Sequence, residues 1–287
     1  MTESICCRIL PTPMPLITLT SDFGEEDYLA GAVKGILLNH IQQAQPVDIS
    51  HQLLPFNDHK TAYVVSNTVK YYPDHTYHLI LCNLYYHLPD YLLFVRHQKQ
   101  YYLMADNGLI TMILNEPPEE VVSLPLDQSR QKNIICLIEV LAHAIQRHAS
   151  GETMEAIGNP VSSVKTRKVL QPIITDQYID GQILYIDPYE NVIINITRAQ
   201  FEMACNGRRF KIRYSRNDSL NRISETYADV TPGDRLALFN AAGYLEIAIN
   251  RGNAAGLFGL SGYSEQNQGK YSQARLSYQS VRVVFED

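Results

Sequence analysis

The sequence lacks any stretch of about 18 consecutive apolar residues, the length that a membrane-spanning helix requires. Its first residues also lack a basic segment followed by a long apolar run, which is the pattern of a secretion signal. These two absences predict a protein that neither spans a membrane nor is exported.

A strongly basic segment is missing as well. The 287 residues carry a formal net charge of −6, and the lysines and arginines are scattered along the chain. Proteins that bind nucleic acids or anionic membranes usually concentrate positive charge on one face. We therefore expect neither nucleic acid nor a membrane among the partners.

Cysteine usage offers no metal-binding or disulfide framework. The five cysteines show no CxxC spacing and, being odd in number, cannot all pair: Cys6, Cys7, Cys82, Cys136 and Cys205. Cys82 and Cys136 lie inside apolar runs. This pattern predicts reduced thiols in a cytoplasmic protein.

Motifs that signal a particular chemistry are also absent. The chain has no GxGxxG or GxxxxGK[ST] phosphate-binding loop, no GxSxG elbow and no HExxH pair. His143 and His148 lie five residues apart in an expected helix and do not share a face, which favours structural roles over metal binding. The sequence therefore predicts no metal and no cofactor.

In the first half of the chain, short apolar strands alternate with segments of helical periodicity. The expected strands are 16–20, 47–50, 77–82 and the antiparallel pair 92–95 and 101–104; the expected helices are about 27–40, one capped by residue 57 or 58, and 134–148. Such alternation is typical of βαβ units, which form a mainly parallel sheet with helices on both faces.

Beyond Val169 this alternation ends, and short strands separated by turn residues follow. They are expected at 183–187, 192–196, 210–214, 236–239, 245–250 and 281–285. The spacing favours a compact β-barrel or a sandwich. We predict two domains, an α/β domain at 1–168, ordered from about residue 15, and a β domain at 173–287, with a linker at about 159–172.

Polar residues directly after the strands are the candidates for a ligand site, because ligands of open α/β sheets bind beyond the carboxyl ends of strands. Asp22 follows the first strand, and its carboxylate can accept two hydrogen bonds from a ribose diol. The spacing is equally compatible with a cap on the next helix. Asp48 lies in a strand end and the segment 106–108 follows a strand, but both are ordinary turn sequences.

Three segments of the second half share this ambiguity. Residues 186–191 connect two strands, and residues 239–246 have the pattern of a hairpin. Residues 251–255 follow a strand and are small, which would let the backbone approach a flat ring. Taken singly, each is explained by the conformation that a turn requires.

Taken together, these segments resemble the S-adenosylmethionine hydroxide adenosyltransferases, the family that also contains the fluorinating and chlorinating enzymes. The similarity runs in order over nearly the whole chain, through residues 17–35, 47–51, 106–108, 186–195 and 232–255. It implies an α/β domain with a Rossmann-like sheet followed by a small β-barrel. It also implies a homotrimer, with the pocket between one subunit's first domain and a neighbour's second.

The resemblance further implies S-adenosylmethionine as ligand and substrate, and hydrolysis to adenosine and L-methionine as the reaction. Asp22 would hold the ribose, and Phe23 would line the pocket. The other implied contacts belong to the second half: Asp187 and Asn191 would bind the methionine part, and Tyr189, Asn240, Asn253 and Ala254 would surround the amino acid and adenine.

The sequence departs from the family at the hydrolytic residues. Asn83 stands where water-activating members carry Asp, and an amide cannot act as a carboxylate base. Asp90 or Tyr91 takes the place of Arg, and the segment 133–136 offers no His. His87 is the candidate to activate water instead, the alternative being that its loop only packs on the surface. The sequence thus supports a hydrolase, or a degenerate adenosyl-binding sensor or scaffold.

Overall fold

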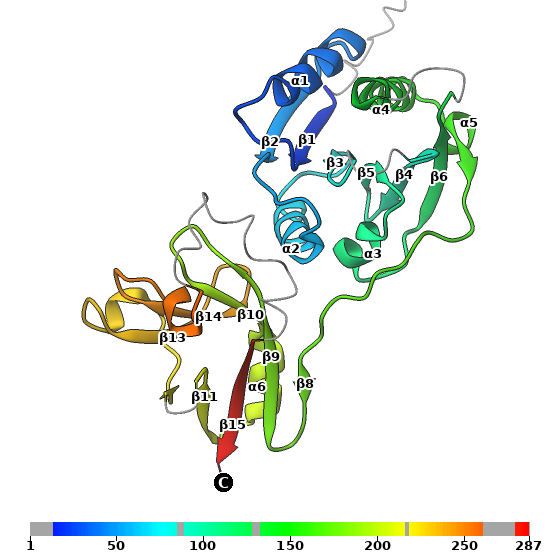
Figure 1. Ribbon diagram of the computed structural model, residues 1–287. Coiled ribbons are helices and arrows are strands. Elements are labelled where there is room, and N and C mark those ends of the chain that lie inside the picture. Colours follow the sequence, from blue (N-terminus) through cyan, green and yellow to red (C-terminus); the bar gives the residue numbers. More distant parts are fainter. Residues whose placement is uncertain (1–13, 85–88, 128–132, 216–217, 261–278, 287) are drawn as a thin grey trace, which may run out of the picture. The chain divides into compact units, whose positions relative to one another are not determined.

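The computed structural model describes residues 14–84, 89–127, 133–215, 218–260 and 279–286 (Figure 1). Contacts group the chain into two compact units. The first comprises residues up to Leu53, Thr68–Asn107 and Glu116–Lys165, and the second comprises Leu54–Asn67, Gly108–Asn115 and the chain from Thr166 onward. Two short segments of the first half therefore belong to the second unit, and the predicted domain boundaries stay a prediction.

The first unit is built on a seven-stranded sheet with the order β2-β1-β3-β5-β4-β6-β7. Neighbours among β1, β2, β3 and β5 are parallel, whereas β4, β6 and β7 pair in antiparallel fashion. The strands are β1 Leu16–Ser21, β2 Gln45–Ser50, β3 Tyr77–Leu81, β4 Tyr91–His97, β5 Gln100–Ala105, β6 Glu120–Pro125 and β7 Asn159–Pro160. The expected parallel strands and the antiparallel pair are confirmed, in a mixed sheet with three parallel and three antiparallel pairings.

Helices connect these strands, both in segments where the sequence predicts them, such as 134–149, and in the segment 154–157, where it does not. They are α1 Leu29–His40, α2 Asp58–Val69, α3 Leu109–Leu114, α4 Ile134–Ala149 and α5 Met154–Ile157. Asn57 caps α2 by accepting the N–H of Lys60 at 3.1 Å, and Asn133 caps α4 by accepting the N–H of Cys136 at 3.0 Å. These caps satisfy backbone donors that the first helical turn leaves without partners.

Helices α1 and α4 pack against each other over one face of the sheet (Figure 1). Leu19 of β1, Val33 of α1 and Leu141 of α4 are fully buried in this core. The opposite face is buried too, and there Thr18 forms a 2.7 Å hydrogen bond with His78 Nδ1. Strands buried on both faces are the usual condition of a parallel sheet.

The strand order creates a topological switch point between β1 and β3. From β1 the chain passes through α1 to β2 on one side, and then crosses to β3 on the other side of β1. The loops that follow β1 and β3 therefore lead away in opposite directions. Such a place at the carboxyl edge of a sheet is where ligands of open α/β folds bind.

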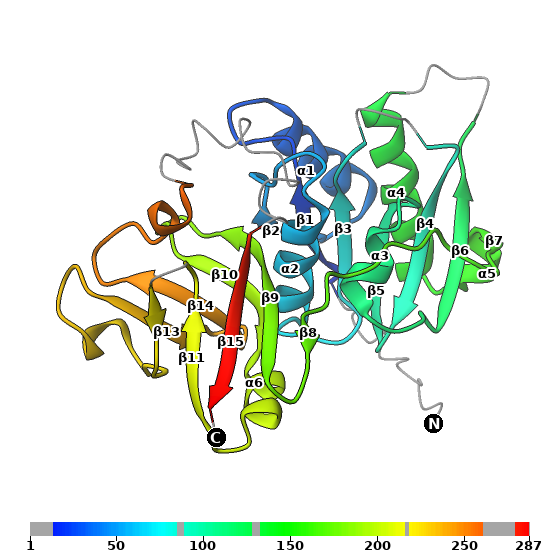
Figure 2. The same cartoon turned by 60° about the horizontal axis from the view of Figure 1, so that its bottom comes forward.

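The second unit contains an antiparallel, barrel-like sheet with the order β12-β11-β15-β9-β10-β14-β13, in which β15 lies between β11 and β9 (Figure 2). The end strands β12 and β13 contact each other, which nearly closes the sheet. Its strands are β8 Ile173–Ile174, which pairs with β9, β9 Tyr178–Ile186, β10 Val192–Thr197, β11 Arg209–Arg213, β12 Ser219–Leu220, β13 Arg235–Phe239, β14 Tyr244–Ile249 and β15 Ser280–Glu286.

One helix of this unit departs from the expectation of strands alone. Helix α6 spans Arg198–Cys205, and short 3-10 turns follow at Tyr227–Asp229 and Ala255–Phe258. Thr197 and Gln200 form a reciprocal capping box that starts α6. This pair was a readable signal, because Thr followed three residues later by Gln marks a helix start.

Strand β9 comes very close to β10 at Gly181. A Cβ atom at this position would lie 2.6 Å from Ile194 Cγ2 and 2.7 Å from Ile196 Cδ1. Only glycine leaves room for these fully buried side chains, so Gly181 permits the tight packing of the barrel.

In the part of the chain that the structure describes, no helix combines the length and the apolar character that crossing a membrane would need.

Candidate functional site

Asp22 lies at the carboxyl end of β1, at the switch point. Its Oδ2 accepts the backbone N–H of Asn83 at 2.8 Å, which joins the loops after β1 and β3. Its Oδ1 is buried and has no hydrogen-bond partner among the described residues. One oxygen thus anchors the side chain, while the other can accept a hydroxyl hydrogen from a ligand.

Burial raises the pKa of the Asp22 carboxyl, although the backbone N–H groups of Asn83 and of Asp22 itself act in the opposite direction. The protein therefore keeps a partly desolvated acid at this edge, a condition that is typical of functional sites. The alternative that Asp22 caps the next helix is wrong, because Tyr28 is the N-cap residue of α1 and no side chain caps that helix end.

Asn83 contributes its backbone to the site. Its φ angle is 60°, in the left-handed region that Asn tolerates better than most residues. Its N–H meets the Asp22 carboxylate from this conformation. The contact of Asn83 with Asp22 is therefore made by the backbone N–H, which does not depend on the side chain at this position.

Two further predicted residues, Phe23 and His87, follow β1 and β3 in the sequence. Phe23 is half-buried and packs against the core of the first unit, while its N–H reaches Ser21 Oγ at 3.4 Å. His87 lies outside the described residues. Its role in activating water therefore stays a prediction.

Asp106, directly after β5, forms hydrogen bonds within the protein through both carboxylate oxygens. Its Oδ1 accepts the N–H of Lys165 at 2.9 Å, and its Oδ2 accepts the hydroxyl of Tyr91 at 2.8 Å. The bond to Asp106 raises the pKa of Tyr91. With both oxygens occupied and only 8% of its surface exposed, Asp106 holds the segment around Lys165 against the sheet edge.

In the second unit, Asp187 closes the turn between β9 and β10. Its Oδ1 accepts the N–H groups of Tyr189 at 2.9 Å and of Asn191 at 2.8 Å, and its Oδ2 accepts Asn191 Nδ2 at 3.2 Å. Glu190 adopts a φ of 62° to complete the turn. Asn191 is buried, whereas Tyr189 is 80% exposed.

The other predicted residues of this unit also shape loops. Asn240 Oδ1 accepts the N–H groups of Ala242 and Tyr244, at 3.0 and 3.1 Å. Asn253 Oδ1 accepts the N–H of Gly256 at 2.8 Å, and Ala254 is fully buried in the barrel core. The two Asn side chains thus stabilise the conformations of their loops, and Ala254 packs in the core.

The loops that carry these residues contact one another. The N–H of Ala255 donates to the carbonyl of Glu190 at 2.9 Å, which joins the segment after β14 to the turn after β9. The predicted residues Asp187, Asn191, Asn253 and Ala254 therefore belong to adjoining loops at one place in the second unit.

Glu246 is a candidate that the sequence analysis missed. It lies on β14 with 2% of its surface exposed, and Tyr227 donates its hydroxyl to Glu246 Oε1 at 2.5 Å. Asn191 Nδ2 reaches the same Tyr227 oxygen at 3.5 Å, so Glu246 is linked to the turn of Asp187. Burial raises the pKa of Glu246, and the charge of Asp187 adds to this rise.

A signal for Glu246 was present in the sequence. It is the single acid in the apolar strand Tyr244–Ile249, and a carboxylate in such a strand is costly unless other groups satisfy it. A buried polar network beside the Asp187 turn is therefore part of the candidate site.

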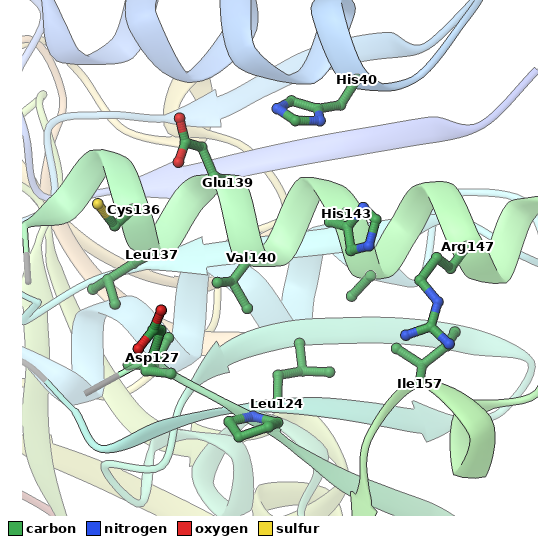
Figure 3. A pocket seen from close by; sticks show the side chains of 13 residues that line it. His40, Leu124, Asp127, Cys136, Leu137, Glu139, Val140, His143, Arg147 and Ile157 are labelled. Carbon is green, nitrogen blue, oxygen red and sulfur yellow. The ribbon is translucent and has the colours of Figure 1, made fainter. Parts of the chain in front are cut away.

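A separate recess of about 500 Å³ lies between α4 and β6 (Figure 3). Apolar side chains such as Leu124 and Val140 line it, with Asp127 and Arg147 toward its opposite ends. None of the predicted site residues lines this recess. Among the described residues, no group of three His, Cys, Asp or Glu side chains is arranged to hold a metal ion.

Profiles of two known domains match the chain. The SAM hydroxide adenosyltransferase N-terminal domain matches residues 17–158, and the C-terminal domain of the same family matches residues 181–265. The chain belongs to the SAM hydroxide adenosyltransferase family. The resemblance drawn from the motifs is therefore confirmed.

Curated relatives cover most of this family member. An (R)-S-adenosyl-L-methionine hydrolase of Thermus thermophilus is 28% identical over 257 residues, which are 84% of this chain and 94% of the relative. A hydrolase of the same name from Methanocaldococcus jannaschii is 24% identical over 267 residues, 86% and 93% of the two chains. A fluorinase of Actinopolyspora mzabensis is 23% identical over 276 residues, 84% and 92% of the two chains.

Two solved structures support the fold of the family member. An uncharacterized conserved protein from Thermotoga maritima has a TM-score of 0.74 at 19% identity, over 94% of this chain and all of its own. A conserved hypothetical protein from Thermus thermophilus has a TM-score of 0.68 at 24% identity, over 95% of this chain and all of its own. The predicted combination of an α/β sheet and a barrel-like sheet is confirmed.

Proposed function

We propose that this protein binds S-adenosyl-L-methionine and hydrolyses it to adenosine and L-methionine. Membership of the SAM hydroxide adenosyltransferase family and the relatives named as hydrolases support the choice of substrate. The single observation that carries the proposal is the buried Oδ1 of Asp22, which lacks a partner among the described residues. A ribose hydroxyl supplies the donor that this oxygen lacks.

In the proposed complex, Asp22 accepts hydrogen bonds from the ribose and the ring of Phe23 lines the pocket. Asp187 and Asn191 bind the methionine part, and Tyr189, Asn240, Asn253 and Ala254 surround the amino acid and adenine. The hydrogen bond between Ala255 and Glu190 supports a common role for the loops of the second unit, because it holds them together. The protein acts in the cytoplasm as a homotrimer, in which neighbouring chains complete each pocket.

The proposed reaction is a displacement at the 5′ carbon of the ribose. The oxygen of a water molecule bonds to this carbon while the bond from the carbon to sulfur breaks. Sulfur keeps the electron pair and becomes the neutral thioether of methionine, and the water releases one proton. Since the positive charge of the sulfonium disappears, orientation and partial dehydration of the water contribute more than stabilisation of an anion.

Asp22 contributes to this reaction by fixing the ribose. Two hydrogen bonds to one carboxylate restrict both the position and the rotation of the sugar, which keeps its 5′ carbon in one place relative to the attacking water. The bond from Asn83 to Asp22 keeps the carboxylate itself in position.

A second candidate function, adenosyl binding without turnover, is favoured by Asn83. The amide of this residue cannot take a proton from water, and its backbone N–H is committed to Asp22. A protein of this kind would serve as a sensor or scaffold.

Incubation with S-adenosyl-L-methionine separates the two functions. We expect the wild-type protein to release adenosine and methionine in equal amounts, as measured by chromatography against a buffer control. Calorimetric binding of S-adenosyl-L-methionine without adenosine release would establish the second function instead. Absence of both binding and turnover would exclude the two proposals together.

A further inference from the structure

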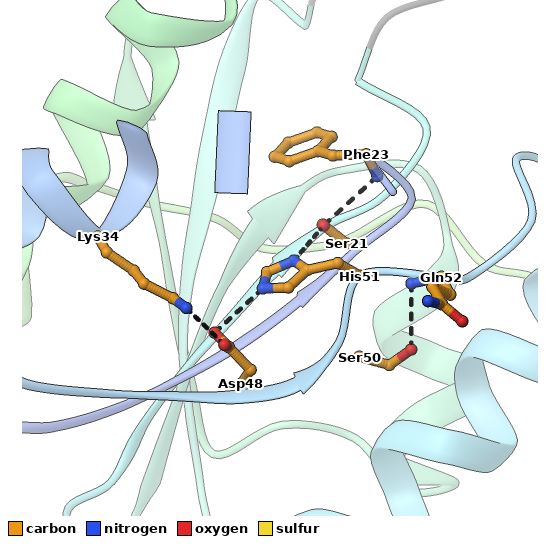
Figure 4. A network of polar contacts seen from close by, with 7 residues as sticks. All are labelled: Ser21, Phe23, Lys34, Asp48, Ser50, His51 and Gln52. Carbon is orange, nitrogen blue, oxygen red and sulfur yellow. Dashed lines mark hydrogen bonds and ion pairs between the residues drawn. The ribbon is translucent and has the colours of Figure 1, made fainter. Parts of the chain in front are cut away.

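We propose that Ser21, His51 and Asp48 form a positioning relay that holds Asp22 in its ligand-binding orientation. The relay begins at the peptide group after Asp22 and ends at the ion pair of Asp48 with Lys34 (Figure 4). It rests on the proposed adenosyl-binding function and deepens it, because it names the residues that act on the ligand through Asp22.

The geometry of the relay is continuous. Ser21 Oγ lies 2.7 Å from His51 Nδ1, and His51 Nε2 lies 3.0 Å from Asp48 Oδ1. Lys34 Nζ donates to Asp48 Oδ2 at 2.5 Å. Ser21 and His51 are 1% and 3% exposed, whereas Asp48 and Lys34 lie at the partly exposed end.

The direction of the hydrogen bonds follows from the charge of Asp48. Partial burial opposes ionisation, but the bonds from Lys34 and His51 outweigh it and lower the pKa of the Asp48 carboxyl. An ionised carboxylate only accepts, so His51 carries a hydrogen on Nε2, and in the neutral ring this tautomer leaves Nδ1 to accept the hydroxyl of Ser21. The Ser21 oxygen then accepts the N–H of Phe23, and every donor of the relay points toward Asp48.

Backbone hydrogen bonds support the same segment. The N–H of Gly24 donates to the carbonyl of His51 at 2.7 Å, and the N–H of Leu53 reaches the carbonyl of Ser21 at 3.4 Å. The residues before and after Asp22 are therefore both held by the segment that follows β2. These bonds restrain the backbone on both sides of Asp22, whose Oδ2 is held by Asn83 and whose Oδ1 has no partner among the described residues.

The connectivity is that of a Ser-His-Asp triad, but its function here is positioning. The Ser21 oxygen is almost completely buried and already accepts the Phe23 N–H, so it is not placed to attack a ligand. Buried polar groups add little net stability compared with apolar groups of the same shape. The relay therefore serves orientation, as supporting hydrogen bonds do around other binding groups.

Calorimetry of S-adenosyl-L-methionine and adenosine on the full chain tests the relay. Ser21→Ala should weaken binding about tenfold, and Ser21→Thr, which keeps the hydroxyl, should restore most of the loss. Asp48→Asn changes the partly exposed end of the relay and should weaken binding too, because it removes the charged acceptor of His51 and Lys34. Asp74→Asn is the matched control, because it removes an exposed, ion-paired carboxylate that contacts Lys99 instead.

A double-mutant cycle shows whether the relay acts through Asp22. In an Asp22→Ala background, Ser21→Ala should cause no further loss of affinity, since the group that it positions is gone. Losses that simply add up, or an unchanged affinity in both Ser21→Ala and Asp48→Asn, would overturn the proposal.

A measurement without ligand keeps the test separate from the proposed function. Nitrogen-15 NMR of the wild-type protein, recorded at a pH where the His51 ring is neutral, should show the Nε2–H tautomer. Ser21→Ala should speed hydrogen exchange at the Phe23 amide. A neutral His51 ring with its hydrogen on Nδ1 would overturn the relay, whereas the expected tautomer combined with no binding of either ligand would overturn the proposed function alone.

Discussion

At the scale of single residues, Asp22 combines two opposing demands. A ligand hydroxyl donates more strongly to an ionised acceptor, yet burial makes ionisation costly at this place. The hydrogen bond from the N–H of Asn83 to Oδ2 offsets only part of this desolvation energy. A buried carboxylate at a strand end that is only partly stabilised by hydrogen bonds is typical of a site that serves binding rather than stability.

The pH dependence of stability should reveal this cost. Because burial raises the pKa of Asp22 above the ordinary value of 3.8, the folded state binds this proton more tightly than the unfolded state. Its contribution to stability is therefore fully present below that value and is lost as pH rises through the folded-state pKa. Asp22→Asn should raise the melting temperature at pH 7, and calorimetric scans should show the gain shrinking toward acidic pH.

Replacing Asp22, although expected to stabilise the fold at pH 7, should weaken the binding of the ligand. Asp22→Ala removes the acceptor of the ribose hydroxyls and should weaken adenosine binding by about 1 to 3 kcal/mol, as measured by calorimetry. Glu26→Gln is the matched control, because it neutralises an exposed acid in the same loop. Equal affinities of the wild-type protein and Asp22→Ala would contradict the assignment of Asp22.

Asn83 permits a test for gain of activity. Asp tolerates the left-handed conformation about as well as Asn, and its backbone can still donate to Asp22. Asn83→Asp should therefore raise the rate of adenosine release about tenfold or more, by adding a base near the proposed site. A variant that binds normally but releases adenosine no faster than the wild type would show that the acid alone does not restore hydrolysis.

The sequence predicted some residues of the candidate site and missed others for physical reasons. Asp22 was accessible to prediction because its place after a strand is local information. Ser21 was not predicted as part of the site, because its partner His51 is 30 residues away and only the pairing of β1 with β2 brings them together. Asp106 had the same local pattern as Asp22, but contacts with Lys165 and Tyr91 occupy it.

At the scale of elements, close approach of two strands sets the packing of the barrel. Gly181→Ala would push a methyl group into Ile194 and Ile196 and should cost about 1 to 3 kcal/mol of unfolding free energy in a denaturant titration. Gly31→Ala, in the open on the exposed face of α1, should instead stabilise by roughly 0.5 to 1 kcal/mol. Equal effects of the two changes would contradict the packing described for β9.

Elements with strong periodicity were predictable, and those fixed by tertiary contacts were not. The apolar strands β1 and β3 and the long helix α4 follow from their hydrophobic pattern. Strand β6 was not expected, because its pattern is short and ends in proline, and its pairing with β4 defines it. The grouping of residues 54–67 with the second unit likewise depends on long-range contacts.

At the scale of the whole molecule, the proposed pocket requires assembly. A homotrimer of the 32.6 kDa chain has a mass of about 98 kDa, and sedimentation equilibrium should find this mass at micromolar concentration. Addition of S-adenosyl-L-methionine should stabilise the trimer, since a ligand held by two chains favours their association. A monomer with unchanged ligand affinity would contradict a shared pocket.

The central claim is that Asp22 holds the ribose of an adenosyl ligand, and a crystal structure of the protein with adenosine tests it most directly. We predict that a ribose hydroxyl lies within about 3.0 Å of Asp22 Oδ1, while Oδ2 keeps its bond to the N–H of Asn83. Adenosine bound elsewhere, with Asp22 Oδ1 turned to a protein donor, would contradict the account.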